Sequence, residues 1–178
     1  MNRFITYTAT LLLAFGMVLP MSAQAQTDVS IGPRIGVPLG DMSDLEGQVF
    51  FGADARINSE ALPVVLSPSF DFYAFDAPEG SDVSGFAIDL NAFYEFGIDN
   101  QAFTPYAGGG LGITRYSSVA EDPGFGGQTA FETTEVGLNL VGGARFMLDP
   151  VEPFVQLNAK VGSDIDRLGI AGGILFNF

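Results

Sequence analysis

Charged side chains recur at alternate positions along this sequence, and they are the groups best suited to carry chemistry. Paired carboxylates such as Asp89 and Glu95 could act as a general acid and a general base. The alternative interpretation is structural, because opposite charges inside a protein must pair to offset their loss of water. We favour a charge network that fills the interior of the fold, and its expected members are Arg34, Asp54, Arg56, Asp71, Asp89, Glu95, Glu135, Arg145 and Lys160.

Two residue types that catalytic and metal sites commonly use are missing. The chain has no histidine and no cysteine, which excludes Ser-His and Cys-His nucleophiles, disulfides and the commonest metal ligand. A glycine cluster at Gly108, Gly109, Gly110 and Gly112 lies inside an alternating segment and lacks the Lys-Ser/Thr pair of a nucleotide-binding loop. We therefore expect neither an enzyme nor a bound cofactor or metal.

The first 25 residues have the features of a secretory signal peptide. Arg3 supplies a positive start, residues 11–19 are mostly apolar, and Ala23-Gln24-Ala25 is a small-x-small cleavage site. Even counted from Thr8 to Leu19 the apolar stretch has only about a dozen residues, whereas a membrane-spanning helix needs about 20. We predict a cleaved signal peptide over residues 1–25 and a single domain over residues 26–178.

From residue 26 onward the chain is acidic and yet rich in apolar residues. This part holds all 21 Asp and Glu residues but six of the seven Lys and Arg residues, so 6 − 21 gives a net charge near −15. Nucleic acid requires a basic surface, so this charge argues against nucleic acid as a partner. The whole chain is 47% apolar and has 17 phenylalanines, which indicates a folded protein rather than a disordered acidic chain.

Apolar residues occupy every second position in eight segments, and a period of two indicates β-strands. In residues 84–97, for example, Phe86, Ile88 and Leu90 share one phase, opposite Ala87, Asp89 and Asn91. The other segments are 29–38, 48–58, 65–75, 104–116, 134–148, 153–162 and 167–178. Short connections at 59–63, 98–102 and 149–152 alternate with longer ones at 39–47, 76–83 and 117–133, and a tight link at 163–166 joins the last pair. This regular spacing is typical of an antiparallel sandwich or a closed barrel.

Periodicity alone does not say which face meets water, but three features favour a membrane barrel. Most segments reach the roughly 9–11 residues that a tilted spanning strand needs. The charged residues share their phase with many glycines, as expected in a narrow lumen that is packed with side chains. The apolar phase carries aromatic residues near strand ends, as do the girdles of membrane barrels, and these are Phe51, Phe86, Tyr94, Phe96, Phe146, Phe176 and Phe178.

The last residues carry a more specific pattern, with Gly173, Phe176 and Phe178 in the order G-x-x-F-x-F. This pattern resembles the C-terminal assembly signal of bacterial outer-membrane proteins. Together with the signal peptide, the eight segments and PYAGGGLGI at 105–113, it makes the chain similar to the small OmpA/OmpX-type family. The resemblance implies a closed eight-stranded antiparallel up-and-down transmembrane β-barrel in the outer membrane, in contact with lipid and lipopolysaccharide. It also implies that the barrel-assembly machinery recognises Gly173, Phe176 and Phe178 during biogenesis.

Three roles remain open from the sequence: a structural or surface-interaction barrel with a filled lumen, a narrow passive channel for small solutes or ions, and a soluble periplasmic barrel that binds an apolar ligand.

Acidic residues in the expected loops and in the 163–166 link either solvate the surface, as in a salty habitat, or hold divalent cations that bridge to lipopolysaccharide. They are Asp41, Asp44, Glu46, Asp76, Glu79, Asp82, Glu121, Asp122, Glu132, Asp164 and Asp166. The sequence identifies no extracellular partner.

Overall fold

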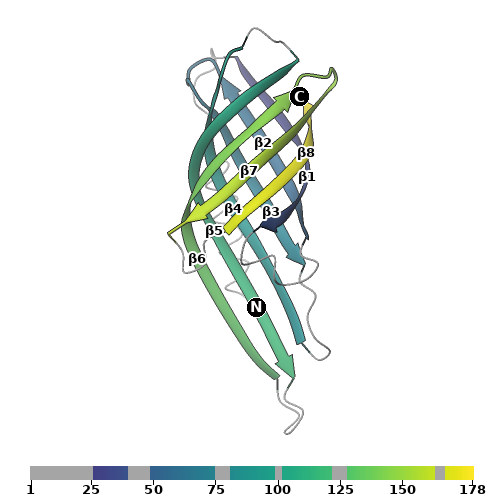
Figure 1. Cartoon of the computed structure of the whole chain (residues 1–178), viewed down its shortest axis with the longest axis vertical. Coiled ribbons are helices and arrows are strands. Elements are labelled where there is room, and N and C mark those ends of the chain that lie inside the picture. Colours follow the sequence, from purple (N-terminus) through teal and green to yellow (C-terminus); the bar gives the residue numbers. More distant parts are fainter. Residues whose placement is uncertain (1–25, 40–48, 75–80, 99–101, 122–127, 163–166) are drawn as a thin grey trace.

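A computed structural model describes residues 26–39, 49–74, 81–98, 102–121, 128–162 and 167–178, and these form one closed β-barrel (Figure 1). Its strands follow chain order: β1 (Thr27–Leu39), β2 (Val49–Ser59), β3 (Val65–Ala74), β4 (Ser81–Glu95), β5 (Phe103–Glu121), β6 (Gln128–Phe146), β7 (Val151–Val161) and β8 (Arg167–Asn177). Each strand pairs antiparallel with the next, and β1 pairs with β8, which closes the barrel. The expected eight-stranded antiparallel up-and-down fold is confirmed.

Several expectations fall on residues outside the described ranges. These include the signal peptide over 1–25 with Ala23 and Ala25, and the acids Asp41, Asp44, Glu46, Asp76, Glu79, Asp122, Asp164 and Asp166. Within the described ranges, no helix is both long enough and apolar enough to cross a bilayer.

The two faces of the barrel wall have opposite chemistry. Large apolar side chains point outward and stay exposed, with Leu111 60%, Val136 60% and Leu140 57% accessible. Charged side chains point inward, where Asp54 and Arg56 are 1% and 2% exposed. This inversion is the one expected of a barrel that faces hydrocarbon. It is incompatible with a soluble barrel that holds an apolar ligand, because such a barrel needs an apolar interior and a polar exterior.

Aromatic side chains gather on the outer surface at both ends of the barrel. At one end Phe51 and Phe72 lie with their ring centroids 5.4 Å apart. At the opposite end Tyr94 and Phe96 are 5.3 Å apart, next to a pair formed by Phe103 and Phe146. Aromatic rings are enriched at the levels where a bilayer meets water. The two groups therefore mark the two interfaces of the membrane.

Strands β5 and β6 are longer than the sequence pattern predicted, since each has 19 residues. Ser117–Glu121 and Gln128–Thr133 were expected in a loop, but they pair with each other as a ribbon that extends beyond the other strands (Figure 1). Asp82, Glu121 and Glu132 consequently lie on strands rather than in loops. We call the end with this ribbon the loop end, and the end that holds Thr27 and Asn177 the turn end.

Candidate functional site

The inward side chains of β1, β2 and β3 form a charged layer across part of the lumen. Arg34 contacts two carboxylates: its Nη1 lies 3.1 Å from Asp54 Oδ2 and its Nε lies 3.0 Å from Asp71 Oδ1. Asp54 also accepts a 3.2 Å hydrogen bond from Ser67 and lies 3.6 Å from Arg56 Nε. All four charged side chains are at most 3% exposed. Two cations and two anions thus compensate one another where water cannot.

Arg56 extends this layer across the lumen to strands that are not its neighbours. Its guanidinium carbon lies 4.4 Å from the ring centroid of Tyr106, 4.8 Å from that of Phe154 and 5.4 Å from that of Phe93. A cation over aromatic faces is stabilised by the ring quadrupoles, more strongly when it is removed from water. The rings come from β4, β5 and β7, so one side chain from β2 ties together four strands of the wall.

A short chain of hydrogen bonds continues from this point. Arg56 Nη2 donates to the Tyr106 hydroxyl at 2.8 Å, and that hydroxyl donates to Gln156 Oε1 at 3.0 Å. Gln156 then donates to Asn158 at 2.9 Å. The Arg56 and Gln156 side chains are among the largest that are fully buried. We call Arg34, Asp54, Asp71, Arg56 and Tyr106 the central layer, and all five side chains are buried inside the barrel.

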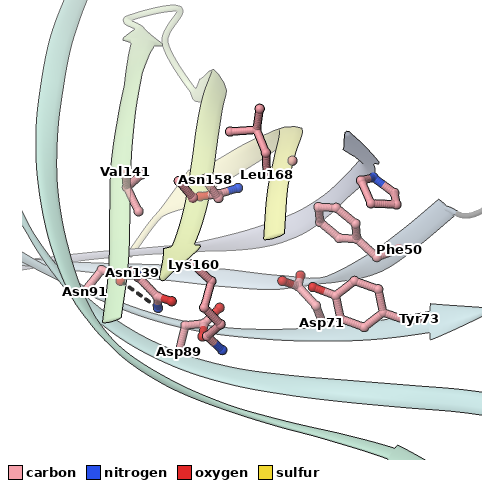
Figure 2. Close-up of a pocket in the computed structure, with 13 residues that line it drawn as sticks. Phe50, Asp71, Tyr73, Asp89, Asn91, Asn139, Val141, Asn158, Lys160 and Leu168 are labelled. Atoms are coloured by element: carbon pink, nitrogen blue, oxygen red, sulfur yellow. Dashed lines mark hydrogen bonds and ion pairs between the residues drawn. The ribbon is translucent and has the colours of Figure 1, made fainter. Parts of the chain in front are cut away.

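Toward the loop end, Lys160 and Asp89 form a second ion pair beside a cavity of about 40 Å³ (Figure 2). Lys160 Nζ lies 3.3 Å from Asp89 Oδ1 and donates a 2.8 Å hydrogen bond to Thr114. Gly112 makes this approach possible, because a Cβ there would collide with the Asp89 carboxylate and lie 2.6 Å from Lys160 Nζ. Beside the pair, Asn139 donates to Asn91 at 3.1 Å. Space for these polar groups therefore depends on a glycine in the wall.

Toward the turn end, Arg145 pairs with two carboxylates. It lies 2.8 Å from Glu95 Oε1 and 2.7 Å from Glu152 Oε2. Glu152 also accepts a 3.1 Å hydrogen bond from Asn177. Glu152 was not among the expected members of the network, because its position falls in the expected connection 149–152. It has the same parity along β7 as Phe154, Gln156 and Lys160, all of which face inward, and that parity is the signal that could have identified it.

Glu135 differs from the other expected members of the network. It is half-buried, and its Oε2 atom is enclosed without a hydrogen-bond partner among the described residues. No ion pair connects it to the other described residues of the network. The expected set is therefore brought together as three groups, around Arg34, Lys160 and Arg145, while Glu135, opposite Thr114 in the register of β5 and β6, joins none of their ion pairs. Across the described ranges, no three acidic side chains gather as a metal site would require.

The residues of the C-terminal pattern lie on both faces of β8. Phe176 and Phe178 face outward and are 45% and 86% exposed. Gly173 is on the inner face, where a Cβ would come within 2.6 Å of the Phe154 ring. The Phe178 amide donates a 2.9 Å hydrogen bond to the carbonyl of Val29, so the last residue is tied to β1.

Comparisons with known proteins give the same architecture. A search of curated proteins finds no significant match. Among solved structures, a major outer membrane protein of Thermus thermophilus is 12% identical and has a TM-score of 0.62, over 86% of this chain and 100% of that one. Ail of Yersinia pestis is 17% identical with a TM-score of 0.59, over 85% and 97%. Neisserial surface protein A is 15% identical with a TM-score of 0.57, over 86% and 99%.

At such low identity these structures are evidence for the fold alone, and the sequence comparison supplies the family. The profile of the outer membrane protein beta-barrel domain matches residues 8–173, which is most of the chain. It agrees with the closed barrel, the apolar outer face and the aromatic girdles described above. The chain therefore belongs to the outer membrane protein beta-barrel domain family and is an integral protein of the bacterial outer membrane.

Proposed function

We propose that this protein is a structural or surface-interaction barrel with a closed lumen, which acts through its extracellular end. The observation that carries the proposal is the central layer. Arg34, Asp54, Arg56 and Asp71 are each 5% exposed or less, and the rings of Tyr106 and Phe154, from strands that do not neighbour β2, lie 4.4 and 4.8 Å from the guanidinium carbon of Arg56. Moving any one of these charges would leave another buried without its partner, which is energetically expensive.

The orientation follows from the ribbon formed by β5 and β6. Outward side chains are apolar as far as Ile113 and Val136, and the next outward positions are Arg115 and Thr134. Arg115 pairs with Glu132 on this outer surface. A bilayer interface between the level of Val136 and the level of Arg115 explains the change from apolar to polar outward side chains, since charged groups are expelled from hydrocarbon. Outer-membrane barrels have short periplasmic turns and longer extracellular loops, so we place the ribbon outside the cell.

The charge of the ribbon bears on what it could bind. Ail has been solved in complex with sucrose octasulfate, a heparin analogue. In this chain, the segment from residue 115 to residue 134 contains Arg115 but also Glu121, Asp122 and Glu132. Like charges across an interface disfavour association. We therefore propose neutral or basic extracellular partners for this barrel rather than sulfated polysaccharides.

A narrow channel is the second candidate, because cavities lie on both sides of the central layer. One of about 40 Å³ lies toward the loop end, and one of about 290 Å³ lies toward the turn end. Conductance in planar bilayers separates the candidates. The closed barrel predicts no steady current, whereas Arg56→Gly, checked for folding by its gel mobility before and after boiling, should admit ions. Steady single-channel steps from the unmodified protein would favour the channel.

We further propose that the protein is not an enzyme and that its assembly depends on the C-terminal pattern. The proposal that it is not an enzyme is supported by the lack of histidine and cysteine in the sequence and by the use of Asp89 and Glu95 as ion-pair partners.

The proposal on assembly is supported by the outward, exposed positions of Phe176 and Phe178, where an assembly factor could reach them. Gly173 would contribute by allowing β8 to pack closely against the Phe154 ring.

A further inference from the structure

The turn end of the barrel contains a cavity of about 290 Å³ that the proposed function does not use. Arg56 lies at its inner end, and the side chains around it include both cations and carboxylates, among them Arg145, Glu152 and Asp28. Its outer margin is apolar, with Val29, Met147 and Phe178. The cavity therefore changes from charged to apolar between the lumen and the edge of the wall.

The apolar margin connects the cavity to the membrane side of the barrel. Phe178 is 86% exposed and is held beside Val29 by the hydrogen bond between its amide and the Val29 carbonyl. Both residues lie on the outward phase of β1 and β8, beyond the girdle residue Phe176. A ligand in this cavity can thus contact charged groups within the lumen and hydrocarbon at the rim at the same time.

Two groups of opposite charge that line the cavity, the Arg56 guanidinium and the Asp28 carboxylate, could still form hydrogen bonds, and they lie at different depths. The Arg56 side chain is 2% exposed, and its Nη1 has no hydrogen-bond partner among the described residues. Two residues farther out, Asp28 lies opposite Asn58, and neither side chain has a hydrogen-bond or ion-pair partner within the described ranges. Two residues of strand separate these levels by about 7 Å, a spacing that a zwitterionic group can bridge.

The balance of charge indicates which zwitterion fits. Arg145 is already paired with both Glu95 and Glu152, so Asp28 adds a carboxylate that no cation of the described residues compensates. The excess of carboxylates would repel a purely anionic group, whereas an ammonium would compensate their negative charge. An ammonium also has three donors, which suit the carboxylate of Asp28 and the side-chain oxygen of Asn58.

We propose that this cavity binds the head group of a zwitterionic phospholipid that ends in a primary ammonium, with its acyl chains crossing the margin at Val29 and Phe178. The phosphate would lie toward Arg56 and the ammonium toward Asp28. The lipid would come from the leaflet that faces the periplasm, because the proposed orientation places the turn end there. The apolar margin favours a lipid over a free amine or phosphate, since a small soluble ion gains nothing from apolar contacts.

Native mass spectrometry of the folded barrel in a nonionic detergent tests this proposal. The probes are phosphatidylethanolamine, phosphatidylcholine and phosphatidylglycerol of equal chain length, and soluble phosphoethanolamine. We expect one retained phosphatidylethanolamine for each barrel, and weaker retention of the other two lipids. Asp28→Asn should weaken phosphatidylethanolamine binding about three- to fivefold, as expected for one partly exposed ion pair. Glu60→Gln removes a carboxylate from the same end without lining the cavity, and it should leave binding unchanged.

Three results would overturn the proposal. Equal retention of phosphatidylglycerol and phosphatidylethanolamine would show that the ammonium is not recognised. Equal binding by Asp28→Asn and the parent would remove Asp28 from the site. Soluble phosphoethanolamine binding as tightly as the lipid would show that the apolar margin contributes nothing. Each result leaves the closed lumen and the extracellular role unaffected, because those depend on the central layer and the ribbon.

Discussion

The guanidinium of Arg56 lies 4.4 Å from the centroid of the Tyr106 ring and donates a 2.8 Å hydrogen bond to the Tyr106 hydroxyl. The two residues belong to β2 and β5, which are not neighbours in the barrel. Their contact therefore spans the lumen rather than following the wall. It joins the ion pairs of Arg34 to the hydrogen bonds of Gln156, and the proposed closure of the lumen depends on it.

Replacing Arg56 by lysine tests this contact while keeping the charge. An ammonium cannot stack on three rings or present the same planar set of donors, so we expect Arg56→Lys to lower the free energy of unfolding by about 2 kcal/mol. Arg115→Lys is the matched control, because Arg115 is partly exposed on the ribbon and should change stability by less than about 0.5 kcal/mol. Urea unfolding in vesicles, followed by gel mobility, measures both. Equal stabilities of the two variants would contradict the role of the rings.

Asp54 is the carboxylate shared by Arg34 and Arg56. Asp54→Asn keeps its shape but leaves two buried guanidinium groups with Asp71 alone, and removing one partner of a buried pair costs about 3–5 kcal/mol. Asp149→Asn, at an exposed position of a turn, is the control and should be nearly neutral. The same unfolding assay applies. A loss below about 1 kcal/mol would mean that water reaches the layer and screens its charges.

The position of the membrane leads to a further pair of variants on the outer face of β6. Leu140 is 57% exposed near the middle of the predicted hydrocarbon span, where an arginine costs about 2–4 kcal/mol. Thr134 lies on the same face beyond the polar transition, so Thr134→Arg should cost close to nothing. Unfolding free energies in lipid vesicles compare the two. If both arginines cost the same, the interface has been placed at the wrong level.

The role of the C-terminal pattern is tested by measuring assembly into the outer membrane in cells rather than the free energy of unfolding. Phe178→Ala should lower the fraction of folded, outer-membrane protein and raise the unassembled fraction in the periplasm, without affecting export. Ile174→Ala removes apolar area from the same outward face of β8 at a position that the pattern leaves variable, so its assembly should match that of the parent. Fractionation and gel mobility before and after boiling provide the readout. Equal yields of folded Phe178→Ala and parent would exclude this residue from the signal.

Much of the fold could be predicted from the sequence, because apolar and polar side chains must alternate along a strand that faces lipid on one side and a polar lumen on the other. The phase that contains Leu138 and Leu140 identifies the outer face, and the phase that contains Asn139 identifies the inner one. The ribbon was missed for the same reason. Residues 117–121 and 128–133 are mostly small or polar in sequence and show no apolar alternation, so they resemble a loop.

The candidate site could be predicted only in part. Inward charges such as Arg34 and Asp71 are recognisable from their phase, but their pairing depends on the stagger between strands, which the phase does not determine. Arg56 illustrates this limit, since its aromatic partners lie on β4, β5 and β7. Glu135 has the same phase as the paired residues, and its Oε2 atom nevertheless has no hydrogen-bond partner among the described residues. Residue type and phase therefore do not determine which charges pair.

Spin labelling along β6 tests the central claim most directly, and the absence of native cysteine allows a single label at each position from 136 to 145. In lipid vesicles, collisions with oxygen report contact with hydrocarbon. We predict maxima at 136, 138, 140, 142 and 144 and minima at 137, 139, 141, 143 and 145, because the even positions face lipid and the odd ones face the packed lumen. Maxima at the odd positions, or no alternation at all, would contradict the account.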